Sequence, residues 1–142
     1  MAINEHPAIG TILICDFDRG FVAPEMVKRR PVVVVSPKIS VRYGLCTVVP
    51  ISTEVPSPKM PYHLELGGLQ PPLPEPWDQG PNWIKGDMIY SVSFNRLDFI
   101  RYGKNSDGKR VYRFETLSSE QMKSIRKCML SALGLVGLTQ HL

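Results

Sequence analysis

Two separated groups of polar residues have the side-chain types that phosphate chemistry needs. Arg30 and Pro31 stand before a run of four valines, and Ser52 and Thr53 follow shortly after the apolar segment Leu45–Pro50. The short connection between these segments predicts antiparallel pairing, which brings the start of one beside the end of the other. A guanidinium beside hydroxyl groups offers a planar fork of donors that matches phosphate oxygens. On the residues alone, a strand-capping arginine and ordinary turn residues explain the same pattern.

A second pair, Lys85 and Asp87, could move protons. The two residues are two positions apart in a predicted strand, so both side chains are expected on one face. A carboxylate beside a cation stays ionised and can accept a proton from a hydroxyl group. An ordinary surface ion pair is the alternative. His63, with an ordinary pKa of about 6.5, is another possible base, although a plain surface histidine is the simpler interpretation.

Short β-branched segments bounded by turn residues predict the elements that position these groups. The valine run after Pro31 indicates a strand buried on both faces. At the C-terminal end, Ser118 and Gln121 match a helix capping box, and Gly134 is a plausible helix stop. The remaining strands are expected at 10–17, 45–50, 62–66 and 83–93, where Gly86 allows a bend, followed by a hairpin of 97–102 with 110–114. The pattern predicts one domain over residues 1–142, a small, mostly antiparallel β-barrel with a helix across one face or end.

Composition narrows the function classes. The chain has 142 residues, a net charge of +4 and an isoelectric point of about 9.1, so polyanions become reasonable partners where the cations cluster. Cys15, Cys46 and Cys128 are far apart and form no CxxC pair, which argues against a zinc site and for a reducing compartment. No cofactor is predicted. No secretory signal or membrane-spanning apolar run is visible, so a cytoplasmic protein without membrane contact is expected.

The ordered blocks of the chain resemble the MazF/PemK/Kid family of toxins from type II toxin–antitoxin pairs. The blocks are 10–17 followed by Asp18, then Arg30–Pro37, then Val48–Thr53, with Lys85-Gly86-Asp87 near the fifth predicted strand. The resemblance covers most of the chain and is weakest over 67–82 and 101–117. The chain departs from the family in having Lys85 where the better-studied member has arginine, and in a longer proline-rich loop before it.

The resemblance implies an SH3-like barrel with a C-terminal helix, like that of CcdB, Kid and MazF, usually as a homodimer. Members are typically metal-independent endoribonucleases that cut single-stranded mRNA at short sequences and are neutralised by a cognate antitoxin, here expected to be acidic. In the family, residues at the positions of Arg30 and Ser52 are linked to catalysis. In some members, so are residues at the positions of Lys85 and Asp87.

The chemistry follows from these residues. The RNA 2′-hydroxyl would attack the phosphorus, leaving a 2′,3′-cyclic phosphate and a 5′-hydroxyl. Arginine is a poor base but a strong electrostatic stabiliser, so Arg30 is assigned to the phosphate with Ser52 or Thr53 as supporting donors. Asp87 is the better candidate base, with Lys85 as acid or charge partner.

Further residues could bind RNA outside the reacting atoms. Lys28 and Arg29 would attract the RNA backbone, and three loop or strand residues could shape binding, namely Glu25, Arg42 and His63. Solvated charges are the alternative for Glu25 and Arg42. Trp77, Trp83 and Phe21 could stack unpaired bases, although Trp83 fits a partly buried position better.

Two rival functions use the same sequence pattern. A CcdB-like toxin would bind DNA gyrase without cutting RNA, and a catalytically degraded member would only engage nucleic acid or antitoxin. The fold alone does not separate these activities. The feature that favours the nuclease is the ordered set of Arg30, Ser52 and Lys85-x-Asp87.

Overall fold

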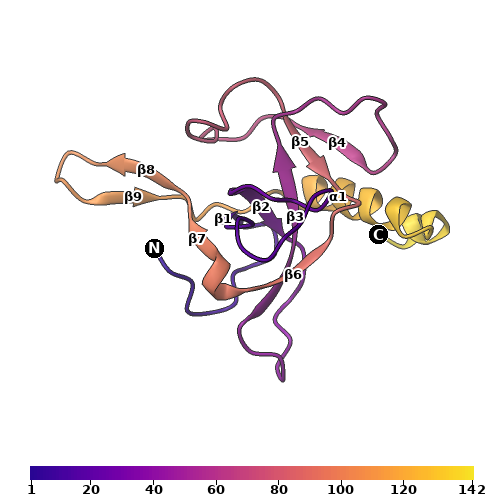
Figure 1. The fold of residues 1–142 in the computed structure, drawn as a ribbon, viewed down its shortest axis with the longest axis horizontal. Helices are drawn as coiled ribbons and strands as arrows, with labels where there is room; N and C mark the ends of the chain where they lie inside the picture. The colour runs from indigo at the N-terminus through magenta and orange to yellow at the C-terminus, as the bar shows by residue number, and fades with distance from the viewer.

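The computed structural model describes residues 1–142, which form mainly short antiparallel strands followed by one long helix (Figure 1). The strands of the main sheet are β1 (Ile12–Cys15), β2 (Arg30–Val34), β3 (Leu45–Ser52), β4 (His63–Leu66), β5 (Asn82–Lys85), β6 (Tyr90–Ser93) and β7 (Leu97–Phe99). The remaining elements are the 3-10 helix η1 (Phe94–Arg96), the hairpin strands β8 (Arg101–Lys104) and β9 (Arg110–Tyr112), the helix α1 (Ser119–Ala132) and the 3-10 helix η2 (Val136–His141). The mainly β fold with a C-terminal helix is therefore as predicted.

The main sheet is antiparallel in the order β4-β5-β3-β2-β1-β7, and β6 pairs with the first half of β3. The chain passes from β6 to β7 through η1, and these two strands form no ladder with each other. The SH3-like barrel that the resemblance implies is thus not closed by hydrogen bonds, since β6 and β7 are joined by η1 and not by a ladder. β4, β6 and β7 each pair with one strand and form the edges of an incomplete barrel.

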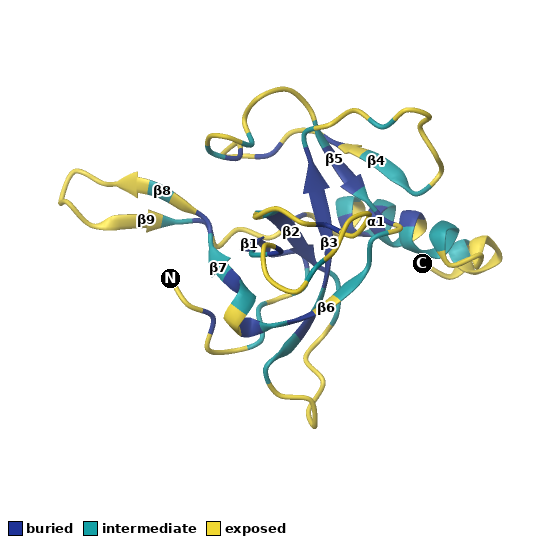
Figure 2. Ribbon diagram, in the orientation of Figure 1, coloured by how far each residue is buried: buried dark blue, intermediate teal, exposed yellow.

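Both faces of the sheet are buried, which explains the unbroken valine run. Val32 and Val34 contribute to one apolar cluster with the inward residues of β1, β3 and β6, whereas Val33 contributes to a second cluster on the opposite face. All three valines are fully buried (Figure 2). The cysteines behave as small apolar residues, and burial raises the pKa of Cys15 to about 12 and that of Cys46 to about 11.

The single strand expected over 83–93 is two strands. The second half of β3 pairs with β5, and its first half pairs with β6. Residues 86–89 between them leave the sheet as a turn. Gly86 is required there because an added Cβ atom would lie 2.7 Å from the Cβ atom of Cys128 in α1 and 2.9 Å from the carbonyl oxygen of Tyr62. The helix therefore presses directly on the turn that carries Asp87.

Residues 67–81, here called the proline-rich strap, are expected from the sequence to lie on the surface, but they contribute to the core. Leu69 and Leu73 are buried in the second apolar cluster, and Trp77 packs against it. The buried Arg113 donates from Nη1 to the carbonyl oxygen of Pro71 at 2.6 Å. The strap is thus anchored along its length, because apolar side chains recur at four-residue intervals between its prolines.

The C-terminal helix begins as the sequence predicts. Ser118 Oγ accepts a hydrogen bond from the Gln121 N–H, and the Gln121 side chain accepts one from the Ser118 N–H. Gly134 follows the helix with a φ of 74°, a conformation that favours glycine. The predicted hairpin around Asp107-Gly108 is present as β8 and β9, which project from the body (Figure 1). None of the helices has the length and apolar character needed to cross a membrane.

Candidate active site

Arg30 and Ser52 are neighbours, as antiparallel pairing of β2 and β3 predicts. The ladder pairs Val32 with Pro50. Arg30 is two residues before Val32 and Ser52 is two residues after Pro50, so the same register brings Arg30 level with Ser52. Ser52 is the last residue of β3 and is only 7% exposed. Its Oγ accepts a hydrogen bond from the Glu54 N–H at 3.1 Å, which leaves the hydroxyl hydrogen free to donate.

Two cavities meet at Arg30 and Ser52. The first, the turn-side cavity, has a volume of about 390 Å³ and brings together six of the predicted site residues, namely Glu25, Arg30, Ser52, His63, Lys85 and Asp87. The second, the strap-side cavity, has a volume of about 290 Å³ and gathers Lys28, Arg29, Thr53 and Trp77 beside Arg30 and Ser52. Nine of the ten predicted site residues therefore line one connected region.

Arg30 is held without a protein partner. Its Nε atom is buried and has no hydrogen-bond acceptor, and the guanidinium forms no ion pair. Burial lowers the pKa of Arg30, while the nearby Glu54 carboxylate and the Tyr90 hydroxyl oppose that shift. The guanidinium remains charged at any ordinary pH. A partly buried cation with an unused donor is arranged to receive an anion from outside the chain.

Lys85 and Asp87 reach the turn-side cavity by a different route from the one predicted. Lys85 is the last residue of β5, but Asp87 is in the turn, so their side chains are not placed by strand alternation. The turn is held by the Gly86 N–H, which donates to the Tyr62 carbonyl at 2.9 Å. Lys85 and Asp87 do not form the surface ion pair that was considered as an alternative. The one ion pair in the protein joins the N-terminus to Asp98.

His63 is part of the site rather than an isolated surface residue. It lies opposite Lys85 in the β4–β5 ladder, and its Nδ1 accepts a hydrogen bond from the Met60 N–H at 3.0 Å. Burial and the charge of Lys85 lower the pKa of His63, and the Asp87 carboxylate opposes that shift. With Nδ1 occupied as an acceptor, the neutral ring carries its proton on Nε2. Neutral His63 is therefore a hydrogen-bond donor rather than a base.

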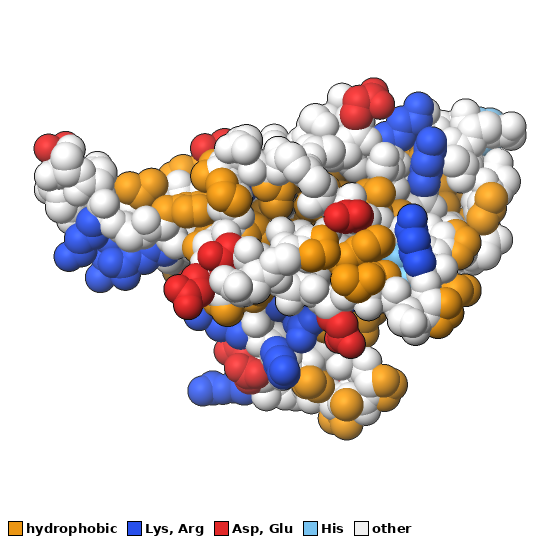
Figure 3. All heavy atoms as spheres, turned by 90° about the horizontal axis from the view of Figure 1, so that it is seen from above, with side chains coloured by type: hydrophobic (Ala, Val, Ile, Leu, Met, Phe, Trp, Pro, Cys, Tyr) orange, Lys and Arg blue, Asp and Glu red, His pale blue; other side chains and the backbone are white.

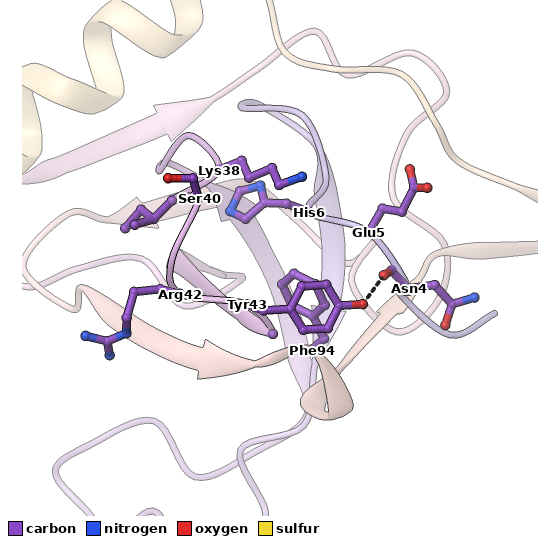
Figure 4. A pocket seen from close by; sticks show the side chains of 10 residues that line it. Asn4, Glu5, His6, Lys38, Ser40, Arg42, Tyr43 and Phe94 are labelled. Atoms are coloured by element: carbon purple, nitrogen blue, oxygen red, sulfur yellow. Dashed lines mark hydrogen bonds between the residues drawn. The ribbon is translucent and has the colours of Figure 1, made fainter.

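Arg42 is the predicted residue that lies elsewhere. It is in the 37–44 turn and lines a cavity of about 550 Å³ with His6, Lys38, Tyr43 and Phe94 (Figure 4). This cavity is larger than the two at Arg30, but the turn that forms it joins the end of β2 to the start of β3. Arg30 and Ser52 are at the opposite ends of those strands. The β2–β3 register that unites Arg30 with Ser52 therefore separates both from Arg42.

The three aromatic residues predicted to stack bases occupy different environments. Trp77 lines the strap-side cavity, but Trp83 is 8% exposed and pairs with Ser52 in the β3–β5 ladder. Phe21 packs edge-on against Phe17 and Tyr90, so its ring serves the core. Of these three rings, that of Trp77 lines a cavity together with Arg30.

Glu54 is a site residue that the sequence reasoning missed. It lines both cavities and its charge acts on Arg30. Its position one residue beyond Thr53, at the end of β3, was the available signal. No group of three or more His, Cys, Asp and Glu side chains lies close enough together to hold a metal ion.

Comparison with known proteins agrees with this architecture. Solved structures similar to this chain include a MazF from Deinococcus radiodurans (16% identity, 92% of this chain and 99% of that one, TM-score 0.63) and a mycobacterial endoribonuclease in complex with its cognate antitoxin (18% identity, 91% and 96%, TM-score 0.60). At such low identity, this likeness shows the shared fold.

Similarity in sequence extends over nearly the whole chain. It is 32% identical to an uncharacterised protein of Haemophilus influenzae, covering 94% of each chain, and 30% identical to the putative protein YifN of Escherichia coli K12, covering 97% of this chain and 99% of that one. A family model described as the PemK-like, MazF-like toxin of type II toxin–antitoxin systems matches residues 8–133. The chain therefore belongs to the PemK-like, MazF-like family of type II toxins.

Proposed function

We propose that this protein is a toxin that acts as a metal-independent endoribonuclease on single-stranded RNA. The observation that carries the proposal is the unpartnered guanidinium of Arg30, which shares a cavity with Ser52, Lys85 and Asp87. Family membership and the solved structures of mycobacterial endoribonucleases with the same fold support it. A phosphodiester is an anion of the right geometry for the planar guanidinium.

The proposed reaction is a transfer within the RNA itself. The 2′-oxygen forms a bond to phosphorus as the bond from phosphorus to the 5′-oxygen breaks. Asp87 takes the proton of the 2′-hydroxyl, and Lys85 gives a proton to the departing 5′-oxygen. The products are a 2′,3′-cyclic phosphate and a 5′-hydroxyl. Such proton transfers contribute about 10²–10⁴-fold to the rate.

Arg30 stabilises the negative charge that grows on the phosphate oxygens during this reaction. The Ser52 hydroxyl, and Thr53 beside it, add donors to the same oxygens. Neutral His63 offers its Nε2 proton to the substrate rather than removing one, so a carboxylate acts as the base. Of the three carboxylates in the turn-side cavity, Glu25 accepts a hydrogen bond from the Val22 N–H and Glu54 acts on Arg30, so we assign the base to Asp87. Lys28, Arg29 and Trp77 hold the flanking RNA at the strap-side cavity.

The test is RNA cleavage in the presence of a metal chelator, with product ends identified by mass spectrometry. Arg30→Ala and Asp87→Asn are each expected to lose at least about 100-fold in rate while the fold is retained. Asp18→Asn is the matched control because Asp18 is exposed and outside both cavities. A substrate with a 2′-deoxy nucleotide at the cut site should resist cleavage. Full activity of Asp87→Asn would remove Asp87 as the base, and gyrase inhibition without RNA cuts would favour the CcdB-like alternative.

We include two partners in the proposal. An acidic antitoxin peptide would bind across the cationic region around Arg30, and titrating it should inhibit cleavage. Two similar solved structures are complexes of such toxins, one with a cognate antitoxin and one between MazE and MazF. A homodimer is the expected assembly, and light scattering of the free protein tests it.

A further inference from the structure

The hairpin formed by residues 101–112, here called the basic arm, contains cations that lie outside both cavities of the candidate active site. Its strands β8 and β9 pair only with each other and form a sheet separate from the main one. Figure 3 shows lysine and arginine side chains gathered on this projection. The arm is a structured element, held by the Asn105 side chain, whose Oδ1 accepts hydrogen bonds from the N–H groups of Asp107 and Lys109 at 3.0 Å.

The charges of the arm have no partners in the protein. Arg101, Lys104, Lys109 and Arg110 are all exposed, and Asp107 is the one acidic residue, so four cations less one carboxylate leave +3 of the chain's net +4. Lys104 lies directly opposite Arg110 in the ladder, and neither forms an ion pair. Like charges at facing positions destabilise a two-stranded sheet. A bound polyanion would reverse that cost.

The base of the arm is anchored to the proline-rich strap. Directly after β9, the buried Arg113 donates from Nη1 to the Pro71 carbonyl and to the Tyr102 hydroxyl at 3.2 Å. Pro71 belongs to the proline-rich strap, which continues to Pro76 and Trp77 in the wall of the strap-side cavity. One continuous, anchored segment therefore joins the base of the arm to the cavity that contains Arg30.

Aromatic rings lie where the arm meets the body. Phe114 is 58% exposed, with its ring centroid 5.0 Å from that of Phe99 and 6.5 Å from that of Tyr112. Exposed rings beside unpaired cations are the combination that binds single-stranded nucleic acid, by base stacking and backbone attraction. An acidic peptide would need an apolar groove for its anchors, and the three cavities described above are all lined by residues outside the arm.

We propose that the basic arm is a second RNA-binding segment, which binds the backbone of the substrate beyond the cleavage site. The inference rests on the proposed ribonuclease function for the identity of the polyanion. RNA would run from Arg30 past Trp77 along the strap and onto the arm. The arm would then increase affinity for long substrates and leave the chemical step unchanged, because it contributes no atom to the reacting phosphate.

The experiment compares wild type with a K104Q/R110Q variant, and the control is K123Q/K127Q, which removes two cations from α1. Binding of single-stranded RNA of about 20 nucleotides, made resistant to cleavage, is measured by fluorescence anisotropy against salt concentration. Two lost phosphate contacts should make the salt slope shallower by about 1.4 and weaken binding about 25-fold at 0.1 M salt. Turnover of an RNA of about 5 nucleotides should be unchanged. Folding is not compromised, because the substitution removes a like-charge pair.

The outcomes separate this inference from the proposed function. If wild type cuts RNA and K104Q/R110Q binds the long RNA as wild type does, the arm proposal is wrong and the nuclease stands. If wild type binds RNA without cutting it and K104Q/R110Q loses affinity, the arm proposal holds and the nuclease fails. An equal loss of RNA affinity in K123Q/K127Q would show that the effect depends on net charge alone, and the proposal that the arm binds RNA would be wrong. Weakened binding of an acidic antitoxin peptide alone would assign the arm to that partner instead.

Discussion

Replacing Arg30 with methionine should make the protein more stable and destroy its activity. The guanidinium is partly buried, its Nε atom has no acceptor and no carboxylate forms an ion pair with it. Methionine has a similar length and no donor, so it retains apolar contact without the unsatisfied group. The change therefore separates what Arg30 does for folding from what it does for an anionic substrate.

The expected gain follows from two opposing contributions. Relieving an unsatisfied buried donor is worth about 1–3 kcal/mol. Losing the attraction to Glu54, which is exposed, costs about 0–1 kcal/mol. The net increase in the free energy of unfolding is about 0–3 kcal/mol, with a midpoint of about 1.5 kcal/mol, and at that midpoint the melting temperature of a chain of this length should rise by about 3–6 °C. RNA cleavage should fall by about 10²–10³-fold because the developing phosphate charge loses its stabiliser.

The stability measurement is urea unfolding and calorimetry of the RNA-free protein at pH 7, with Arg29→Met as the matched control. Arg29 is exposed, so its replacement should change the free energy of unfolding by less than about 0.5 kcal/mol. Arg30→Met less stable than wild type by more than about 1 kcal/mol, with Arg29→Met unchanged, would refute the reasoning. The guanidinium would then have net favourable partners in the free protein and would not be held ready for a phosphate.

Two further predictions test the surroundings of Asp87. Because the folded pKa of His63 is lowered below its unfolded value of about 6.5, the stability contributed by the neutral ring is complete above that pH and lost as the pH falls. Urea unfolding between pH 7.5 and 5 should show this loss, and His63→Gln should show a smaller one; an unchanged slope would contradict the assignment. Gly86→Ala should destabilise the protein by about 1–3 kcal/mol, because its Cβ would overlap Cys128 and the Tyr62 carbonyl. A neutral result in thermal unfolding would show that α1 can move away from the turn.

The sequence predicts the half of the site that depends on regular pairing. Arg30 and Ser52 are joined by a β2–β3 register that strand order and a short connection already imply. Lys85 and Asp87 do line the cavity that contains Arg30, but the geometry predicted for them is wrong, because Asp87 lies in a turn and not in a strand. The cause is β3, which pairs with β5 and β6 in different registers, so the intervening residues must leave the sheet. The alternation of polar and apolar residues within 83–93 does not indicate that its two halves pair with different parts of β3, so the turn between them could not be predicted.

The strap shows a second limit of sequence reasoning. The chain has thirteen prolines in 142 residues, and a proline-rich stretch favours the prediction of a surface loop. The burial of Leu69 and Leu73 within that stretch was therefore not predicted. The four-residue spacing matches a helical face, but the prolines between these positions exclude a helix, so no regular period predicts their burial. The effect of the Glu54 charge on Arg30 was not predicted for a similar reason, because it depends on how the chain turns after β3.

The anchoring of the strap has a consequence for how the protein is degraded. A fifteen-residue loop beside an active site would ordinarily be cut by proteases through local opening. Here Leu73 is 2% exposed in the same cluster as β1, β2 and α1, so releasing the strap breaks into the core. Opening of this wall should therefore require nearly the free energy of global unfolding. The lifetime of the strap-side cavity in a cell would then be the lifetime of the folded protein itself.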